Sequence, residues 1–242
     1  MAYAFQIDTA GTLTTSLNTY LKLDSNSTDV WGTNNGTDTD ISYVTGKVNN
    51  AADFNGTTSI ITTTNDIAWT KLSFSFWVKF DTLGLADRML FHKGNSDDTA
   101  PEINFQIAGT GTLVGITVNN TLVGSWVAIA DAFTTDTWYH IIITIDEDGD
   151  TAEWFINNVS KMATATAAQT HNNQTEAFVL GKRQDAYAPL DGQIDEFAIW
   201  TKVLSSQERT DLYNGGSGQT MVTPSTVKVG RFASNRTLLG VG

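Results

Sequence analysis

The sequence predicts an all-β protein in which two antiparallel sheets pack as a sandwich, with one short helix near the C-terminus. Most of the chain alternates apolar and polar residues with a period of two, and clusters of Gly, Asn and Asp interrupt this alternation. Hydrophobic residues make up 40% of the chain and charged residues only 17%, which is enough apolar surface for a large core. No convincing helix separates the candidate strands, and this favours a sandwich over a parallel α/β fold.

The alternating pattern outlines about eleven strands in chain order. They are Thr19–Leu23, Ala52–Phe54, Ser59–Thr62, Ser73–Phe80, Met89–Lys93, Ile103–Ile107, Leu113–Val118, Trp138–Asp146, Ala152–Ile156, Ala177–Gly181 and Gln193–Trp200. Two tight turns are expected, at Glu147–Asp150 and at Asn157-Asn158, because Asp-Gly and Asn-Asn pairs tolerate the positive φ that hairpins require.

One helix signal follows the last strand. Ser205 and Glu208 have the spacing of a capping box, Leu204 could start a hydrophobic staple, and Gly215 could end the helix. Its apolar residues Leu212 and Tyr213 would dock it on the sandwich. We therefore expect a structural helix here, not a chemical motif.

The charge is distributed unevenly along the chain. No acidic residue follows Asp211, whereas Lys228, Arg231 and Arg236 do, so the tail carries +3 and the rest −15 (11 basic against 26 acidic residues). Together with Phe232, these basic residues are expected to form an assembly tail that docks on an acidic neighbour, with a solvated tail as the alternative. The net charge of −12 argues against a broad nucleic-acid surface.

The expected organisation is an N-terminal arm at 1–14, one sandwich domain at 15–216, and the basic tail at 217–242 beyond a Gly-rich joint. We expect the tail to pack on a partner subunit in preference to its own domain. The chain has no Cys, no apolar run long enough to span a membrane and no N-terminal pattern typical of a signal peptide, so disulfides and membrane insertion are not expected.

Two segments carry a family resemblance. Residues 20–62 contain a strand ending in Asp, an Asn/Gly-rich loop and an Ala-x-Phe-x-Gly strand, while residues 191–216 read DGQIDEFAIWTKVLSSQERTDLYNGG. This order resembles the laminin-G-like jelly-roll domains of the concanavalin A-like lectin/glucanase superfamily, over roughly residues 15–216. The resemblance implies a jelly roll whose first and last strands are neighbours.

The resemblance also implies a calcium site between the loop after the first strand and the last strand. In this sequence it would bring Asp24 and Asp29 close to Asp195, supplying the hard oxygens that Ca²⁺ prefers. The alternative is that these side chains accept hydrogen bonds from backbone amides and only shape the turns.

A sugar site is expected on the loops at the rim. Its candidate residues are Trp126, Arg183, Asp185 and Tyr187, which combine ring faces for stacking with polar groups for hydrogen bonds. Ordinary loop packing is the alternative.

Catalytic patterns are missing from the sequence. The superfamily's hydrolases carry alternating acids on one strand, whereas here Asp195 and Glu196 are adjacent and are expected to point to opposite faces. His140 lies in the apolar segment WYHIIITI, which is typical of a packed residue and not of a base. We therefore expect no enzymatic activity.

These features favour a structural or adhesive surface protein of a larger assembly, such as a phage or virus decoration, fibre or tail component, which could also hold host glycans. The expected location is a virion or extracellular surface. A stand-alone calcium-dependent lectin module is the alternative. The partners would then be other subunits, glycans or both.

Overall fold

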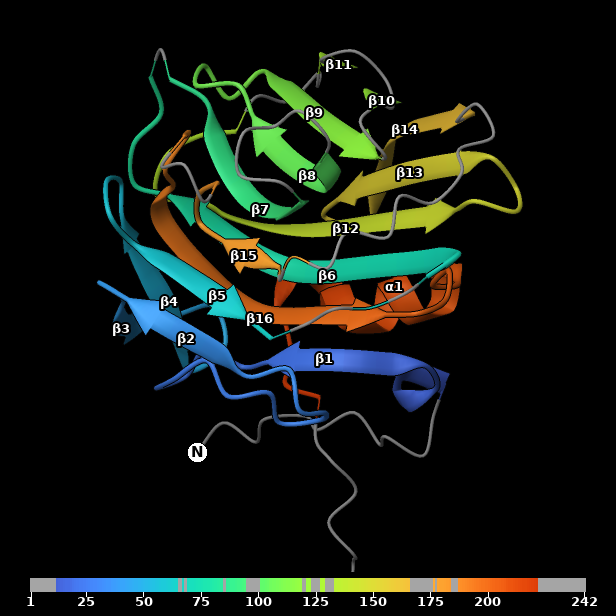
Figure 1. The fold of residues 1–242 in the computed structure, drawn as a ribbon, viewed down its shortest axis with the longest axis horizontal. Coiled ribbons are helices and arrows are strands. Elements are labelled where there is room, and N and C mark those ends of the chain that lie inside the picture. The colour runs from blue at the N-terminus through green and yellow to red at the C-terminus, as the bar shows by residue number, and fades with distance from the viewer. Residues whose placement is uncertain are drawn as a thin grey trace, which may run out of the picture.

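The computed structural model describes residues 12–64, 67, 69–84, 86–94, 101–118, 121–122, 127–128, 133–165, 176, 178–183 and 187–221. These residues form sixteen strands, one α-helix and two short 3₁₀ helices (Figure 1). The strands are β1 (Leu17–Leu21), β2 (Gly36–Thr39), β3 (Ser42–Thr45), β4 (Asn50–Asn55), β5 (Ile60–Thr63), β6 (Lys71–Phe80), β7 (Arg88–Gly94), β8 (Pro101–Ile107), β9 (Leu113–Val118), β10 (Thr121–Leu122), β11 (Val127–Ala128), β12 (Trp138–Asp146), β13 (Thr151–Ile156), β14 (Val159–Ala165), β15 (Val179–Leu180) and β16 (Asp191–Trp200). The helices are η1 (Thr12–Thr14), α1 (Ser206–Tyr213) and η2 (Asn214–Gly216).

The strands form two antiparallel sheets, as predicted. Sheet I has the order β14-β13-β12-β6-β16-β4-β3, and β1 pairs with the second half of β16. Sheet II has the order β10-β9-β8-β7-β15-β5-β2, and β11 pairs with β9. The first and last strands are therefore neighbours, and α1 covers the outer face of sheet I.

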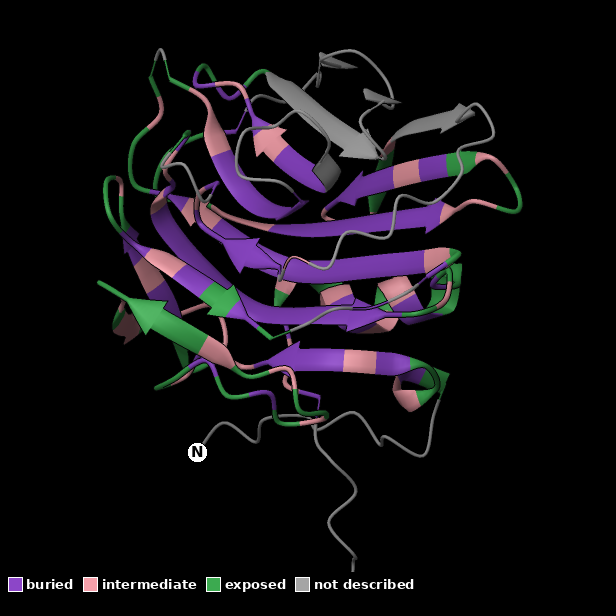
Figure 2. Cartoon of the chain, viewed as in Figure 1, coloured by how far each residue is buried: buried purple, intermediate pink, exposed green. Residues whose placement is uncertain are grey.

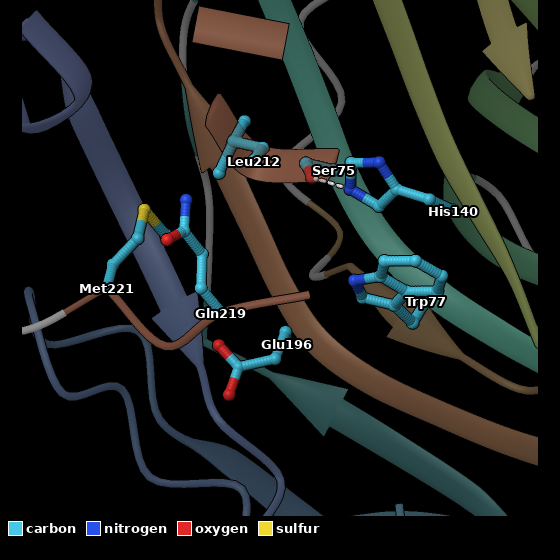
Figure 3. A pocket seen from close by; sticks show the side chains of 7 residues that line it. All are labelled: Ser75, Trp77, His140, Glu196, Leu212, Gln219 and Met221. Atoms are coloured by element: carbon cyan, nitrogen blue, oxygen red, sulfur yellow. Dashed lines mark hydrogen bonds between the residues drawn. The ribbon is translucent and has the colours of Figure 1, made fainter. Parts of the chain in front are cut away.

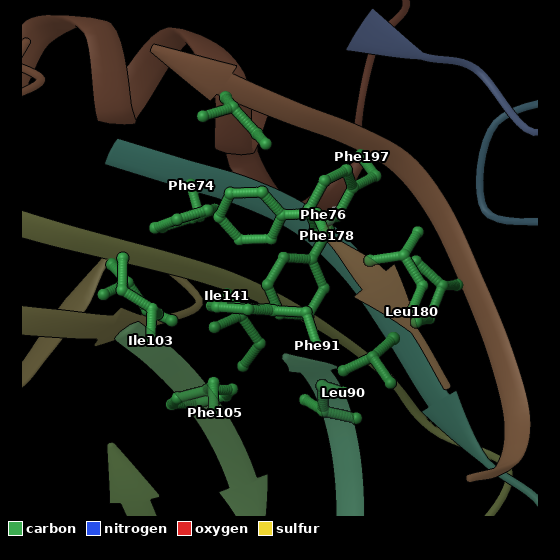
Figure 4. Close-up of a cluster of buried hydrophobic side chains, with 14 of the residues drawn as sticks. Phe74, Phe76, Leu90, Phe91, Ile103, Phe105, Ile141, Phe178, Leu180 and Phe197 are labelled. Atoms are coloured by element: carbon green, nitrogen blue, oxygen red, sulfur yellow. The ribbon is translucent and has the colours of Figure 1, made fainter. Parts of the chain in front are cut away.

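The main core lies between the two sheets. Along β6, the side chains of Leu72, Phe74, Phe76 and Val78 enter this core, while Ser73, Ser75 and Trp77 alternate onto the outer face. Aromatic rings join the layers, with Phe74 of sheet I stacked on Phe91 of sheet II at a centroid distance of 4.6 Å (Figure 4). Figure 2 shows the buried central strands and the exposed edge strand β2.

The eleven predicted strands all appear, with ends that move by a few residues. The alternation missed β2, β3, β10, β11 and β14, which are either two residues long or rich in polar and small side chains. Edge strands bury little apolar surface, so hydrophobic alternation is a weak signal for them.

The predicted turns and helix are also present, with changes of detail. Asn157 and Asn158 both have positive φ (52° and 61°), whereas in the first hairpin the positive φ falls on Asp150 (48°) and not on Gly149. Ser205 caps α1 in a complete capping box, but the left-handed C-cap is Asn214, one residue before the predicted Gly215.

Segments of the chain that lie outside the predicted domain limits of 15–216 also pack on the sandwich. Leu13 is buried, and its carbonyl accepts a hydrogen bond from Trp200 Nε1 (2.7 Å). At the other end Met221 is buried as well. The packed unit therefore begins before residue 15 and continues past residue 216. No helix in the described ranges has the length and apolarity needed to cross a membrane.

Candidate functional site

The loop between β15 and β16 presents Tyr187 at the rim of the sandwich. Within the part of the chain whose burial is described, it is the one aromatic among the exposed large hydrophobic residues, at 45% exposure. The guanidinium carbon of Arg183 lies 4.6 Å from the ring centroid, and the tyrosine hydroxyl donates a hydrogen bond to Asp87 Oδ2 (3.1 Å). These two contacts hold the ring in a fixed orientation.

The backbone of this loop explains why the ring is held. Leu190 N–H donates to the carbonyl of Gly181 (2.6 Å), and Arg183 N–H donates to that of Tyr187 (3.2 Å). Gly181 has a φ of 91°, and a Cβ there would lie 2.2 Å from the Phe54 ring, so only glycine fits where the loop leaves β15. Hydrogen bonds between the two described arms, residues 181–183 and 187–190, thus anchor Tyr187 on the sandwich.

Two of the four predicted sugar-site residues, Arg183 and Tyr187, come together in this way. Trp126 and Asp185 lie outside the described residues. Asp87, from the loop between β6 and β7, was not predicted because nothing in its surrounding sequence marks it as a partner of a tyrosine 100 residues away.

Asp29 is used entirely for folding its own loop. Its Oδ1 accepts hydrogen bonds from the backbone amides of Tyr20, Trp31 and Gly32, and its Oδ2 accepts one from Asn34, all at 3.0 Å. Both oxygens are therefore occupied. For this residue the structure favours the turn-shaping alternative and not the role of a metal ligand.

Asp195 differs from Asp29, although it is equally enclosed. Its Oδ2 accepts a hydrogen bond from Val48 N–H (2.8 Å), while its Oδ1 is buried without a partner. Burial raises the pKa of Asp195 to about 8, and the nearby carboxylate of Asp24 adds to the rise against the opposing effect of the backbone amides of Val48 and Lys47.

The three predicted calcium ligands do not form one metal-binding group. No cluster of three or more His, Cys, Asp or Glu side chains among the described residues could hold a metal ion. Asp24 and Asp195 remain as a pair with an unused buried oxygen, while Asp29 does not fit. The prediction missed this because the sequence does not show how many backbone amides turn back onto Asp29.

The prediction that Asp195 and Glu196 point to opposite faces of the sheet is wrong. The pairing of β16 with β6 shifts between Asp195 and Ala198, and Glu196 is the extra residue of a bulge, with φ of 53°. Asp195 lies opposite Trp77, and Glu196 lines a cavity beside the same tryptophan. Both carboxyl groups therefore face the outer side of sheet I.

The cavity beside Glu196 is lined by both polar and apolar side chains and is very small (Figure 3). Its volume is about 10 Å³, room for about one water molecule, and it is lined by Ser75, Trp77, His140, Glu196, Leu212, Gln219 and Met221. It is too small for a sugar.

The cavity also contains a serine–histidine pair, with Ser75 Oγ 2.9 Å from His140 Nε2. Burial lowers the pKa of His140 to about 3, and its Nδ1 has no hydrogen-bond partner that would orient the ring. A nucleophile needs an oriented base whose pKa is near the working pH. His140 is instead stacked on Trp77 at a centroid distance of 4.8 Å, as a packed residue.

The C-terminal tail begins in contact with its own domain. Residues 217–221, here called the strap, cross the outer face of sheet I, so the start of the tail does not need a partner subunit to be held. The predicted tail residues Lys228, Arg231, Phe232 and Arg236 lie outside the described residues.

Comparison with known proteins agrees with this architecture. Domain 4 of AbnA, a GH43 extracellular arabinanase from Geobacillus stearothermophilus, solved with arabinotriose, is 24% identical, with a TM-score of 0.64 over 81% of this chain and 97% of that one. The binding domain of Paraclostridial Mosquitocidal Protein 1 is 15% identical (TM-score 0.69, covering 84% and 53%). The receptor binding domain of botulinum neurotoxin D is also 15% identical (TM-score 0.66, covering 85% and 54%).

This chain thus spans about half the length of the two toxin domains, and at these identities the likeness concerns the fold. No curated protein matches the sequence. The family model of the concanavalin A-like lectin/glucanases superfamily matches residues 54–208, which include β6, β7, β12 and β16. The chain therefore belongs to the concanavalin A-like lectin/glucanases superfamily.

Proposed function

We propose that this protein is a non-catalytic carbohydrate-binding module that takes a sugar on the ring of Tyr187. The observation that carries the proposal is an exposed aromatic ring held by Arg183 and Asp87 at the rim of a lectin-type sandwich. An amphipathic ring of this kind can stack on the C–H face of a sugar while its hydroxyl stays hydrogen-bonded. The likeness to a domain solved with arabinotriose supports a sugar as the ligand.

The test measures binding of arabinotriose, and then of a panel of other neutral and acidic oligosaccharides, by isothermal titration calorimetry. Tyr187→Ala should weaken binding at least tenfold, because the stacking surface is removed. Tyr187→Phe keeps the ring and should lose only a few-fold. Val203→Ala, at an exposed apolar residue, is the control. Equal affinity of Tyr187→Ala and the unaltered chain would place the sugar elsewhere, and no binding across the panel would reject the proposal.

We also propose that Ca²⁺ binds beside Asp24 and Asp195. The support is chemical: a buried carboxylate oxygen without a partner lies near a second carboxylate, and Ca²⁺ prefers such hard oxygen donors. Bound calcium would neutralise the two carboxylates and tie the loop after β1 to β16. Millimolar calcium should raise the melting temperature of the unaltered chain and not that of Asp195→Asn. An unchanged melting temperature of the unaltered chain would exclude the site.

A second candidate function is that of a structural surface component of a larger assembly, such as a virion, in which the basic tail docks on an acidic neighbour. It is favoured by the charge difference between the tail (+3) and the rest of the chain (−15). In light scattering, we expect the full chain to have a mass greater than that of a monomer. A chain that ends at Met221 should form smaller particles than the full chain. If both are monomers at high concentration, the assembly proposal fails.

A further inference from the structure

The strap is held by consecutive residues at its end. Thr220 Oγ1 donates to Glu196 Oε1 (3.0 Å), and Met221 N–H donates to the hydroxyl of Tyr20 (3.0 Å). The Tyr20 hydroxyl in turn donates to Glu196 Oε2. Gln219 Nε2 donates to the carbonyl of Asp211 at the end of α1. These groups of the domain, together with the apolar surface that receives Met221, are called the clasp.

Met221 adds an apolar contact to these polar ones. Its side chain is 4% exposed and joins a second hydrophobic cluster on the outer face of sheet I. The cluster consists of Leu13, Leu17, Tyr20, Ile142, Phe155, Ala198, Trp200, Leu204, Leu212 and Met221. The clasp thus recognises a backbone amide, a hydroxyl and a methionine side chain, which are the features of a short peptide-docking site.

An empty clasp would be costly for the domain. Glu196 is 6% exposed and Tyr20 is 1% exposed, so both polar groups are buried. Removal of the strap would take away the hydrogen bonds that Thr220 and Met221 provide and would expose the apolar surface that receives Met221 to water. The clasp therefore favours an occupant, although nothing in its chemistry requires the occupant to belong to the same chain.

The residues between α1 and the strap form a hinge. Asn214, Gly215 and Gly216 all have positive φ, between 48° and 87°. A Cβ at Gly215 would meet nothing within 4 Å, so this part of the hinge is not packed against the domain. Glycines accept many other backbone conformations, so the strap can be redirected by rotations at Gly215 and Gly216. The hydrogen bond from Gln219 to the carbonyl of Asp211 is then lost, and the strap of a second copy would restore it.

We propose that the clasp is an exchangeable docking site, filled in assemblies of this protein by the strap of a second copy of the same chain. The contacts would be identical in both arrangements, because the same residues meet. The balance then depends on the hinge, which gives the tethered strap an effective concentration of about millimolar, and on any further contacts of the basic tail with its acidic neighbour. The proposal deepens the assembly function, because it names the segment and the surface through which copies would join.

A hinge deletion tests exchange in the full-length chain. Removal of Gly215 and Gly216 shortens the connection by up to about 7 Å, so the strap no longer reaches its own clasp. We expect this variant to form dimers in light scattering with a melting temperature close to that of the unaltered chain. Adding Met221→Asp, which disfavours burial in the clasp, should return the dimers to monomers. A hinge deletion that remains monomeric would overturn the proposal.

A second measurement keeps the native hinge and does not depend on the folding of the deletion variant. The chain has no cysteine, so single cysteines can carry dyes without side reactions. A donor at Ser217→Cys in one copy and an acceptor at Ser25→Cys in another should show energy transfer after mixing at high concentration, and Met221→Asp in the donor chain should abolish it. No transfer at any concentration would contradict exchange.

The two proposals can fail separately. A chain ending at Met221 keeps the strap and lacks residues 222–242. If the hinge deletion still dimerises in this shortened chain, the strap exchanges without help from the tail. If the full chain assembles but the hinge deletion does not dimerise, the tail joins copies without exchange.

Discussion

At the scale of single residues, Asp195 is a buried acid that sequence alternation treats as an ordinary strand position. It is fully buried, and burial raises its pKa to about 8. A carboxyl group whose pKa is raised on folding binds a proton more tightly in the folded state than in the unfolded state. Its stabilising effect is therefore present at low pH and is lost as the pH rises from about 4 to about 8.

This gives a pH prediction for Asp195→Asn, which keeps the shape without the charge. In the presence of a chelator, the free energy of unfolding of the variant should exceed that of the unaltered chain at pH 8. The gain should be a few kcal/mol, since each pKa unit corresponds to about 1.4 kcal/mol. At pH 4 the two proteins should be alike. Denaturant titrations at both pH values measure the difference. Equal stability of the two proteins at pH 8 would show that the ionised carboxylate of Asp195 does not destabilise the fold.

At the scale of elements, α1 is a short helix whose N-terminus is stabilised by a complete capping box. Ser205 Oγ accepts a hydrogen bond from Glu208 N–H (3.3 Å), and Glu208 Oε2 accepts one from Ser205 N–H (2.9 Å). Although burial opposes ionisation, the ammonium of Lys202 and the amide of Ser205 lower the pKa of Glu208 to about 2. An eight-residue helix has little stability of its own and relies on such caps and on docking.

Ser205→Ala should therefore destabilise the protein by about 1 kcal/mol, the usual cost of losing an N-cap. Ser206→Ala is a matched control, because Ser206 is exposed and lies inside the helix, where alanine is favoured. Thermal denaturation at constant pH compares them. A larger effect of the Ser206 change would mean that the cap does not determine where the helix begins.

At the scale of the whole molecule, the aromatic core joins the two sheets. Phe91 of sheet II is 1% exposed and lies between Phe74 of sheet I (centroid distance 4.6 Å) and Phe105 of its own sheet (5.8 Å). Such a ring contributes through burial and through contact with its neighbours, so its loss leaves a cavity at the centre of the sandwich.

Phe91→Ala should lower the free energy of unfolding by about 3–5 kcal/mol, the cost of truncating a buried aromatic residue. Val159→Ala, at a side chain that is 56% exposed, should change it by less than about 0.5 kcal/mol. Chemical denaturation measures both. A small effect at Phe91 would mean that the two sheets do not depend on this contact.

The sequence alone determined the sandwich, the eleven main strands and the capped helix, because alternation and capping act between residues that are close in the chain. It also singled out Arg183 and Tyr187, through their place in a loop before the last strand. The alternation of apolar and polar residues is visible in the sequence because one face of each strand is buried, whatever the position of the strand in the sheet.

Only the tertiary structure decided what the polar residues do. A bulge in β16 turned Asp195 and Glu196 to one side, and backbone amides occupied Asp29. The clasp joins Tyr20, Glu196 and Met221, which are up to 201 residues apart. Such groups meet because burial of apolar surface brings distant segments together, and hydrogen bonding then selects among the polar groups that burial has enclosed.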